Sequence, residues 1–168
     1  MKKKLTRQLL AQGIEELVER DKALACAVER FGPPPLWGRK PGFAALIKII
    51  LEQQVSLTSA DAVFQKLNTA VPEITPASIE ELSAPGLRKL GFTRQKAGYC
   101  EGLAVAIRTG ELNLKGLEGM EDDAAHTTLL KIRGIGPWTA NIYLLMALRR
   151  PDIWPDGDLA LAESARRI

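Results

Sequence analysis

A short glycine-rich stretch interrupts helix-like sequence near the carboxyl end of the chain. Gly134, Ile135 and Gly136 follow Arg133 and precede Pro137. Glycine permits a positive φ and a close approach of the backbone to another molecule, and proline fits the first position of a helix. The unpaired amides at the start of the second helix would form an anion site, for which a phosphodiester is the natural ligand. Such main-chain contacts would position a nucleic acid without reading its sequence.

An ordinary turn between two helices is the alternative explanation for two glycines at this spacing. The wider pattern favours a nucleic acid, because Arg133 is positively charged and the small residues Thr139 and Ala140 open the following helix. Lys96, near the start of another predicted helix, could add a phosphate contact or could be an ordinary solvated cation.

The hairpin must be carried by helices, and helical periodicity dominates the chain. Apolar residues recur at three- and four-residue steps, and no alternating strand pattern of useful length occurs. The predicted fold class is therefore all-α. Helices are expected over two stretches before the breaker 31–42, over about 43–54, after the caps Ser56, Thr75 and Thr93, from a cap at Asp122 or Asp123 to 131, over about 137–148, and from near 156–158.

Composition limits the partners and the compartment. The chain of 168 residues carries a net charge of +3, which permits a polyanionic partner without requiring one. Its length fits one domain or two small lobes that share a core. Cys26 and Cys100 lie in apolar helical patterns and are predicted to be core thiols, without the spacing of zinc or iron–sulfur ligands. Since no export signal and no bilayer-spanning run is present, a cytoplasmic protein without membrane contact is expected.

The residues 129–148, followed by 154–159, resemble the hairpin and Gly/Pro…Asp signature of the helix–hairpin–helix (HhH-GPD) DNA glycosylases. Within that superfamily the sequence is most similar to the 3-methyladenine DNA glycosylase II branch. The resemblance covers about 35–168 and implies a two-lobed, all-helical fold with a cleft between the lobes, preceded by N-terminal helices in 1–34. It also implies base excision repair, in which a damaged base is flipped out of double-stranded DNA and its N-glycosidic bond is hydrolysed. We expect a monomer, associated with the nucleoid if the cell is bacterial.

The acid of that signature matches Asp158, which lies 22 residues after Gly136. Breaking a base–sugar bond builds positive charge on the sugar, and a nearby carboxylate stabilises that charge or orients the attacking water. Asp156 is a competitor, and any single aspartate here could instead cap the last helix. The signature has its acid directly before a Leu-x-Leu pair, so the resemblance favours Asp158 for catalysis, and Asp156 could then take the cap.

The position two residues after Gly136 distinguishes two kinds of glycosylase. Family members that also cleave the strand resemble one another in having a lysine there, which forms a Schiff base with the sugar. This chain has Trp138, so the resemblance implies an enzyme without lyase activity. Trp138 could also be an ordinary core residue; in the resembling branch, aromatic rings stack on the extruded base. The predicted substrate pocket contains Trp138, Ile142 and Tyr143, although Tyr143 would point about 100° away from the family's aromatic position.

A second matching motif joins two helices around Gln53, Gln54 and Ser56. The resemblance implies that this turn enters the minor groove and that Gln54 fills the gap left by the flipped nucleotide; two glutamines at a solvated helix end are the alternative. The predicted DNA-binding residues are Gln53, Gln54, Ser56, Lys96, Arg133, Gly134, Ile135, Gly136 and Thr139. The resemblance further implies that the main-chain carbonyls of Leu130, Ile132 and Ile135 can hold a sodium or potassium ion. We expect that no cofactor is required and that no iron–sulfur cluster is present.

Two other classes of function remain open. One is a non-catalytic helix–hairpin–helix module that only grips DNA, and the other is a helical protein-interaction domain. The position of Asp158 favours an enzyme, because a binding module has no need of that carboxylate. Relatives in this family usually continue through further helices after the position of Asp158, so the helices closing this lobe are expected to be short or missing. Exposed apolar residues around Leu159 and Leu161, or self-association, would support this expectation.

Overall fold

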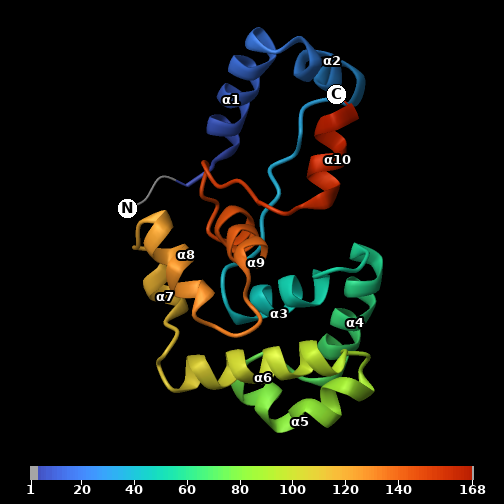
Figure 1. Cartoon of the computed structure of the whole chain (residues 1–168), viewed down its shortest axis with the longest axis vertical. Coiled ribbons are helices and arrows are strands. Elements are labelled where there is room, and N and C mark those ends of the chain that lie inside the picture. Colours follow the sequence, from blue (N-terminus) through green and yellow to red (C-terminus); the bar gives the residue numbers. More distant parts are fainter. Residues whose placement is uncertain (1–3, 168) are drawn as a thin grey trace.

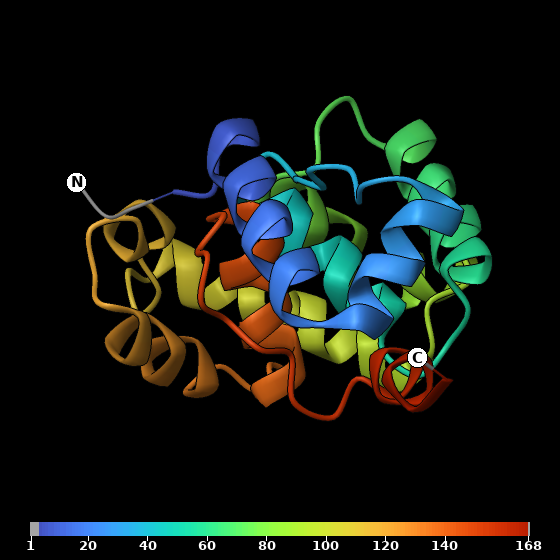
Figure 2. The ribbon, with the colours of Figure 1, turned by 90° about the horizontal axis from the view of Figure 1, so that it is seen from above.

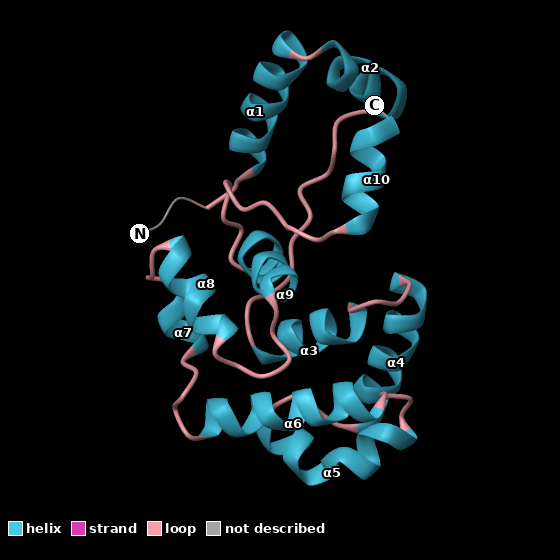
Figure 3. Cartoon of the chain, viewed as in Figure 1, coloured by secondary structure: helices cyan, strands magenta, loops and turns pink. Residues whose placement is uncertain are grey.

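The computed structural model describes residues 4–167, and all regular structure in that range is helical (Figure 1, Figure 3). The elements are α1 (Arg7–Arg20), α2 (Lys22–Phe31), α3 (Phe43–Glu52), α4 (Leu57–Ala70), α5 (Pro76–Lys89), α6 (Arg94–Arg108), α7 (Leu114–Leu117), α8 (Asp122–Leu130), α9 (Pro137–Ile142), the π-helical segment η1 (Tyr143–Ala147) and α10 (Leu159–Arg167). Figure 1 shows α4, α5 and α6 at one end of the molecule and α1, α2 and α10 at the other, with α3 and α9 between them. The prediction of an all-helical fold is confirmed.

Helix α3 forms the centre of the core. It is apolar on nearly every side, as expected of a helix with neighbours all around, and Leu46, Ile47, Ile49 and Ile50 have no exposed surface. It packs against α4, α6, α9 and η1. Burying each of these side chains contributes about 1.5–3 kcal/mol. The core therefore joins the end of the molecule that carries α6 to the part that carries the hairpin.

The predicted helix starts at Ser56, Thr75 and Thr93 are confirmed. Each side chain accepts a hydrogen bond of 3.2 Å from the amide three residues further along, at the start of α4, α5 and α6 respectively. Such a bond satisfies one of the amides that a helix start leaves unpaired. Local sequence is enough to set these helix starts, because donor and acceptor lie within one turn.

Two local predictions are wrong. The residue directly before α8 is Glu121, and not Asp122 or Asp123 as predicted. Both aspartates lie inside the first turn, where their negative charges interact favourably with the helix dipole. Cys26 is exposed, whereas Cys100 is buried as predicted. The reason is that α2 buries no residue at all, so the apolar pattern around Cys26 does not face a core.

The segments at both ends of the described chain pack loosely. Helices α1, α2 and α10 have no buried residue, and seen from above, α1 and α2 lie over the rest of the molecule (Figure 2). Phe31, Trp154 and Leu159 are 77%, 62% and 84% exposed. Leu161, two residues after Leu159, is only partly exposed. None of the helices in residues 4–167 is both long and apolar enough to cross a membrane.

A buried arginine fastens the segment that leads to Asp158. Arg150 is 2% exposed and donates to the carbonyls of Glu118 at 2.9 Å and Met120 at 3.1 Å. Its Nε lies 3.4 Å from a carboxylate oxygen of Asp122. A buried charge is tolerated only where such partners satisfy it. Arg150 therefore ties the start of the loop 149–158 to the turn between α7 and α8.

Candidate active site

The hairpin joins α8 to α9, and its two glycines serve different purposes. Gly134 has a φ of +93°, in the left-handed region, and a Cβ there would lie 2.2 Å from Cγ of Tyr99. Gly136 has φ −91° and ψ 179°, which other residues also adopt. A Cβ on Gly136 would meet no atom within 4 Å. Packing inside the protein explains Gly134, whereas Gly136 leaves a stretch of backbone open to an outside partner.

The three carbonyls predicted to hold a monovalent cation lie within residues 130–135. Leu130 ends α8, and the carbonyl of Ile132 accepts a hydrogen bond of 3.0 Å from the amide of Ile135. A carbonyl oxygen has two lone pairs, so that of Ile132 can still bind an ion. Main-chain carbonyls are ligands of the kind that bind potassium in channel filters.

Trp138 and Asp158 are in direct contact, as the predicted site requires. Trp138 is the second residue of α9, and its indole Nε1–H donates to Oδ2 of Asp158 at 3.1 Å. Both side chains are partly exposed. The loop after η1 thus brings a carboxylate back to the first turn of the helix that follows the hairpin.

The second carboxylate oxygen of Asp158 caps α10. Oδ1 accepts a hydrogen bond of 3.0 Å from the amide of Leu161. Of the two aspartates that the sequence allowed for this cap, the structure therefore gives it to Asp158 and not to Asp156. Helix α10 begins at Leu159, so Asp158 occupies the position directly before it. Asp156 lies two residues before Asp158, on the other side of Gly157, and is exposed.

The hydrogen bonds to Asp158 favour its ionised form. The amide of Leu161 makes the largest contribution to lowering the pKa of Asp158 below its ordinary value of 3.8. Bonds from Trp138 and from the amide of Ala160 lower it further, and they outweigh the opposite effect of partial burial. Asp158 is therefore an anion at neutral pH, better suited to stabilising positive charge than to removing a proton.

This lowered pKa predicts how Asp158 contributes to stability as the pH changes. A carboxylate whose pKa is lower in the folded state than in the unfolded state stabilises the fold above the unfolded value, and the contribution is lost as the pH falls through the folded value. The difference in free energy of unfolding between wild type and Asp158→Asn should stay constant from about pH 8 to about pH 5. It should shrink as the pH falls below 3.8. Urea unfolding across this range measures it, and a difference that grows toward acid would contradict the assignment.

Sequence reasoning did not identify Asn141, which holds the loop that leads to Asp158. Its buried side chain donates from Nδ2 to the carbonyl of Trp154 at 2.9 Å. The available signal was a single amide side chain between Ala140 and Ile142 in an otherwise apolar helix, because a polar group in that setting needs a partner. Asn141 therefore holds the loop that carries Asp158 through the carbonyl of Trp154.

Two of the three predicted pocket residues are turned into the core. Ile142 is 4% exposed and Tyr143 is fully buried. The Tyr143 hydroxyl accepts a hydrogen bond of 3.1 Å from the amide of Gly42, and burial raises the pKa of Tyr143 to about 12. The prediction that Tyr143 lines the pocket is therefore wrong, because its position on the helix directs it to α3 and its preceding loop. Trp138 alone of the three presents surface.

The turn between α3 and α4 presents one of its two glutamines. Gln54 is exposed and has a φ of +55°, a left-handed conformation that is uncommon for a residue with a side chain. Ser56 caps α4 and also lies 2.9 Å from the hydroxyl of Ser59. Gln54 is therefore the residue that can reach outward from this turn.

Three of the predicted DNA-binding side chains make internal bonds. Gln53 donates to the hairpin and to Thr139, which is 2% exposed, and Lys96 donates to carbonyls at the end of α3. Burial lowers the pKa of Lys96. Polar side chains at a helix end can equally serve a neighbouring element. Of the three, only the Thr139 side chain is buried; Gln53 and Lys96 are partly exposed, and their contact with DNA stays a prediction. Arg133, by contrast, is exposed.

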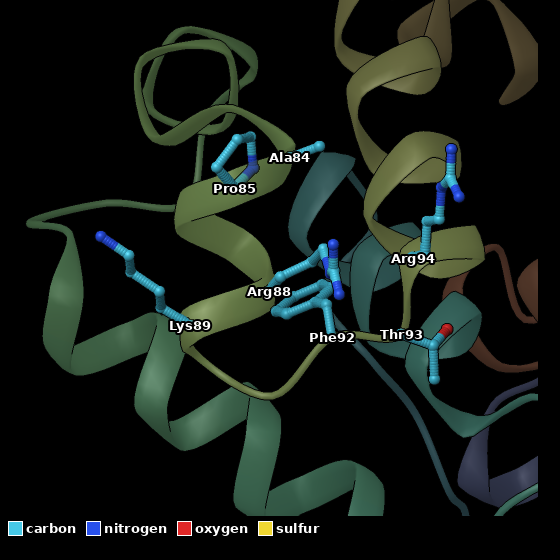
Figure 4. A pocket seen from close by; sticks show the side chains of 7 residues that line it. All are labelled: Ala84, Pro85, Arg88, Lys89, Phe92, Thr93 and Arg94. Atoms are coloured by element: carbon cyan, nitrogen blue, oxygen red, sulfur yellow. The ribbon is translucent and has the colours of Figure 1, made fainter.

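A cavity of about 590 Å³ lies where the end of α5 faces the start of α6. Figure 4 shows Arg88 and Lys89 on α5 with their side chains pointing apart, and Arg94 on α6. These three cations are the charged residues of its lining, which fits an anionic group. Neither Trp138 nor Asp158 lines this cavity, so it is not the predicted pocket for a base.

Comparison with known proteins links this geometry to a set of repair enzymes. A putative DNA-3-methyladenine glycosylase of Bacillus subtilis is 31% identical over 153 residues, which are 86% of this chain and 53% of that protein. The crystal structure of a DNA-3-methyladenine glycosidase from Bacillus halodurans has a TM-score of 0.74 at 28% identity, over 89% of this chain and 70% of that one. A 3-methyladenine DNA glycosylase of Schizosaccharomyces pombe, solved in complex with abasic DNA, shares the fold with a TM-score of 0.85 at 24% identity, over 92% and 79%.

The extent of these matches differs between this chain and its relatives. The chain spans about half the length of the curated relatives that it matches, at 53% and 54%. Residues 47–168 match the family model described as the HhH-GPD superfamily base excision DNA repair protein. That range is well over half of the chain and contains the hairpin, Trp138 and Asp158. The chain therefore belongs to the HhH-GPD superfamily of base excision DNA repair proteins.

Proposed function

We propose that this protein is a monofunctional DNA glycosylase that releases alkylated purines, such as 3-methyladenine, from double-stranded DNA. The observation that carries the proposal is the contact between Asp158 and Trp138. An ionised carboxylate beside an aromatic face, next to a hairpin with open backbone, is the combination that such a reaction needs. The relatives named above supply the class of base.

The hairpin would hold the damaged strand. The open backbone at Gly136 and the exposed Arg133 suit a phosphate. A sodium or potassium ion on the carbonyls of Leu130, Ile132 and Ile135 would add positive charge for that phosphate. These contacts are independent of sequence, as a repair enzyme requires. They would fix the sugar of the damaged nucleotide close to Asp158.

Trp138 would stack on the extruded base. An alkylated purine such as 3-methyladenine is positively charged, so an aromatic face adds about 0.5–2 kcal/mol of cation–π attraction. The edge of the indole is already bonded to Asp158, which leaves the ring face for the base. A charged base is also a good leaving group, so no acid is needed to protonate it.

Asp158 would stabilise the sugar as the base departs. The bond between the sugar carbon and the base nitrogen breaks, its electron pair leaves with the base, and positive charge develops on the sugar. The Asp158 carboxylate is anionic and held by two hydrogen bonds, so it faces that charge without reorganising. Its remaining lone pairs can orient the water whose oxygen bonds to the sugar carbon, and the proton that this water loses passes to the bulk solvent.

The absence of a lysine at the Trp138 position supports hydrolysis without strand cleavage. Lys96 lies one turn before Tyr99, which packs against the hairpin. Its amine donates to two main-chain carbonyls and is therefore not a free nucleophile for the sugar. The proposed products are therefore a free base and an abasic site in an intact strand. Because its substrate is damaged DNA, the enzyme would be associated with the nucleoid in a bacterial cell. It would act on each lesion as a monomer.

A base-release assay tests the proposal directly. Duplexes carrying 3-methyladenine, 7-methylguanine, hypoxanthine or uracil are incubated with the protein, and the free base and the strand are analysed separately. We expect release of alkylated purine, an uncleaved strand before alkali treatment, and no covalent adduct on borohydride reduction. Salt-sensitive DNA binding without release of any base would instead support the non-catalytic module. A borohydride-trapped adduct would contradict the monofunctional assignment.

A further inference from the structure

The side chain of Gln53 bridges two separate parts of the hairpin region. Its Nε2 donates to the carbonyl of Gly134 and to the hydroxyl of Thr139, both at 2.8 Å. Gly134 lies in the hairpin turn, and Thr139 lies in the first turn of α9 and is 2% exposed. A single amide group thus fastens the end of α3 to both arms of the hairpin.

Lys96 holds the same end of α3 from the other side. Its Nζ donates to the carbonyl of Leu51 at 2.6 Å and to the carbonyl of Gln53 at 2.8 Å. The last carbonyls of a helix have no partner inside the helix, and a cation there also favours the helix dipole. Tyr99, one turn further along α6, packs against Gly134. Helix α6 therefore contacts both the end of α3 and the hairpin.

The residue that follows Gln53 has a backbone conformation that needs such support. Gln54 has a φ of +55° and is exposed. A non-glycine residue in the left-handed region persists only where its surroundings fix the chain. Here the carbonyl and the side chain of Gln53 are both bonded on one side, and the Ser56 cap fixes the start of α4 on the other.

We infer that Lys96 and Gln53 are positioning residues that hold the Gln54 turn in a fixed place relative to the hairpin. When the hairpin binds the damaged strand, the Gln54 side chain is then already placed to fill the gap left by the flipped base. The inference rests on the proposed function. In this role Gln53 and Lys96 act through their bonds to the hairpin and to the end of α3. Without these bonds Gln54 would relax to a negative φ and its side chain would leave the gap.

Matched variants test this inference. Lys96→Met and Gln53→Met remove the donors at nearly constant volume, and Lys66→Met removes an exposed lysine from α4 as a control. Single-turnover base release by Lys96→Met and Gln53→Met should fall on the order of 10- to 100-fold, because misplacement by about 1 Å has such an effect. Affinity for undamaged duplex should change by less than about threefold, because the phosphate contacts remain. Lys66→Met should not slow release, and Lys96→Arg should restore part of it.

A second measurement separates positioning from simple loss of stability. Fluorescence of 2-aminopurine placed next to an abasic site reports whether the gap is filled, and thermal unfolding reports the folded fraction. In a Gln54→Ala background, Lys96→Met should lower base release little further, because both changes remove the filling of the gap by Gln54. Independent, multiplying effects would overturn the inference. So would a fluorescence signal of Lys96→Met equal to that of wild type in folded protein.

The two proposals can fail separately. If wild type releases no base from any duplex, the proposed glycosylase activity fails, whereas the 2-aminopurine signal still tests whether Lys96 and Gln53 control the Gln54 turn. If wild type releases base but Gln54→Ala has no effect on release or fluorescence, the positioning inference fails and the glycosylase activity stands. Should Lys96→Met not fold, Gln53→Met carries the same test from the hairpin side.

Discussion

Asp158→Asn should bind DNA as wild type does and lose nearly all base release. The two hydrogen bonds from Trp138 and Leu161 go to different carboxylate oxygens, and the single amide oxygen of asparagine can take the place of only one of them. Asn141 and Arg150 still hold the loop in the variant. The asparagine carries no charge to face the developing cation on the sugar. Loss of a preorganised electrostatic contact of this kind lowers the rate on the order of 10²- to 10³-fold. Single-turnover release of 3-methyladenine, measured with saturating protein, gives the rate, and fluorescence anisotropy with abasic duplex gives the affinity.

The neighbouring acid provides the control for this experiment. Asp156 lies two residues earlier and is exposed, with its amide donating to the carbonyl of Trp154. Asp156→Asn changes net charge by the same amount, yet should alter release by less than about twofold, since surface substitutions away from a site have small effects. If Asp156→Asn lost release and Asp158→Asn kept it, the carboxylates would have been assigned in the wrong order. If neither substitution mattered, the site would lie elsewhere.

Much of the fold follows from interactions within one turn of the chain. The caps at Ser56, Thr75 and Thr93 and the proline that starts α9 involve residues at most three apart, so their types and spacing suffice to predict them. The central burial of α3 follows from an apolar run with almost no polar side, as in any helix with neighbours all around.

The direction of polar side chains depends on partners far away in the sequence and could not be predicted. Gln53 finds partners 81 and 86 residues away, and Lys96 finds one 43 residues away. Nothing in the local pattern distinguishes these side chains from solvated ones such as Arg133. Asp158 shows the same limit, because the sequence left the cap open between Asp156 and Asp158, while in the fold one carboxylate accepts from both Trp138 and Leu161.

Replacing each hairpin glycine by alanine should separate folding from DNA binding. Gly134→Ala should destabilise the protein by about 3 kcal/mol or more, because it combines a left-handed backbone with overpacking. At φ +93° the new Cβ would also overlap the Tyr99 ring. Gly136→Ala should change the free energy of unfolding by less than about 0.5 kcal/mol, as expected for a site with room for the methyl group. Urea unfolding at constant pH measures both values.

In DNA binding, Gly136→Ala is the variant in which we expect the direct effect. If a phosphate approaches the backbone at Gly136, a methyl group there should weaken binding of abasic duplex by about tenfold, equivalent to about 1.4 kcal/mol. It should also reduce the dependence of affinity on salt, because fewer counterions are released when a phosphate contact is lost. Gly136→Ala with full affinity and an unchanged salt dependence would show that no phosphate lies against this glycine. The open space beside Gly136 would then need another explanation, because nothing within the described protein fills it.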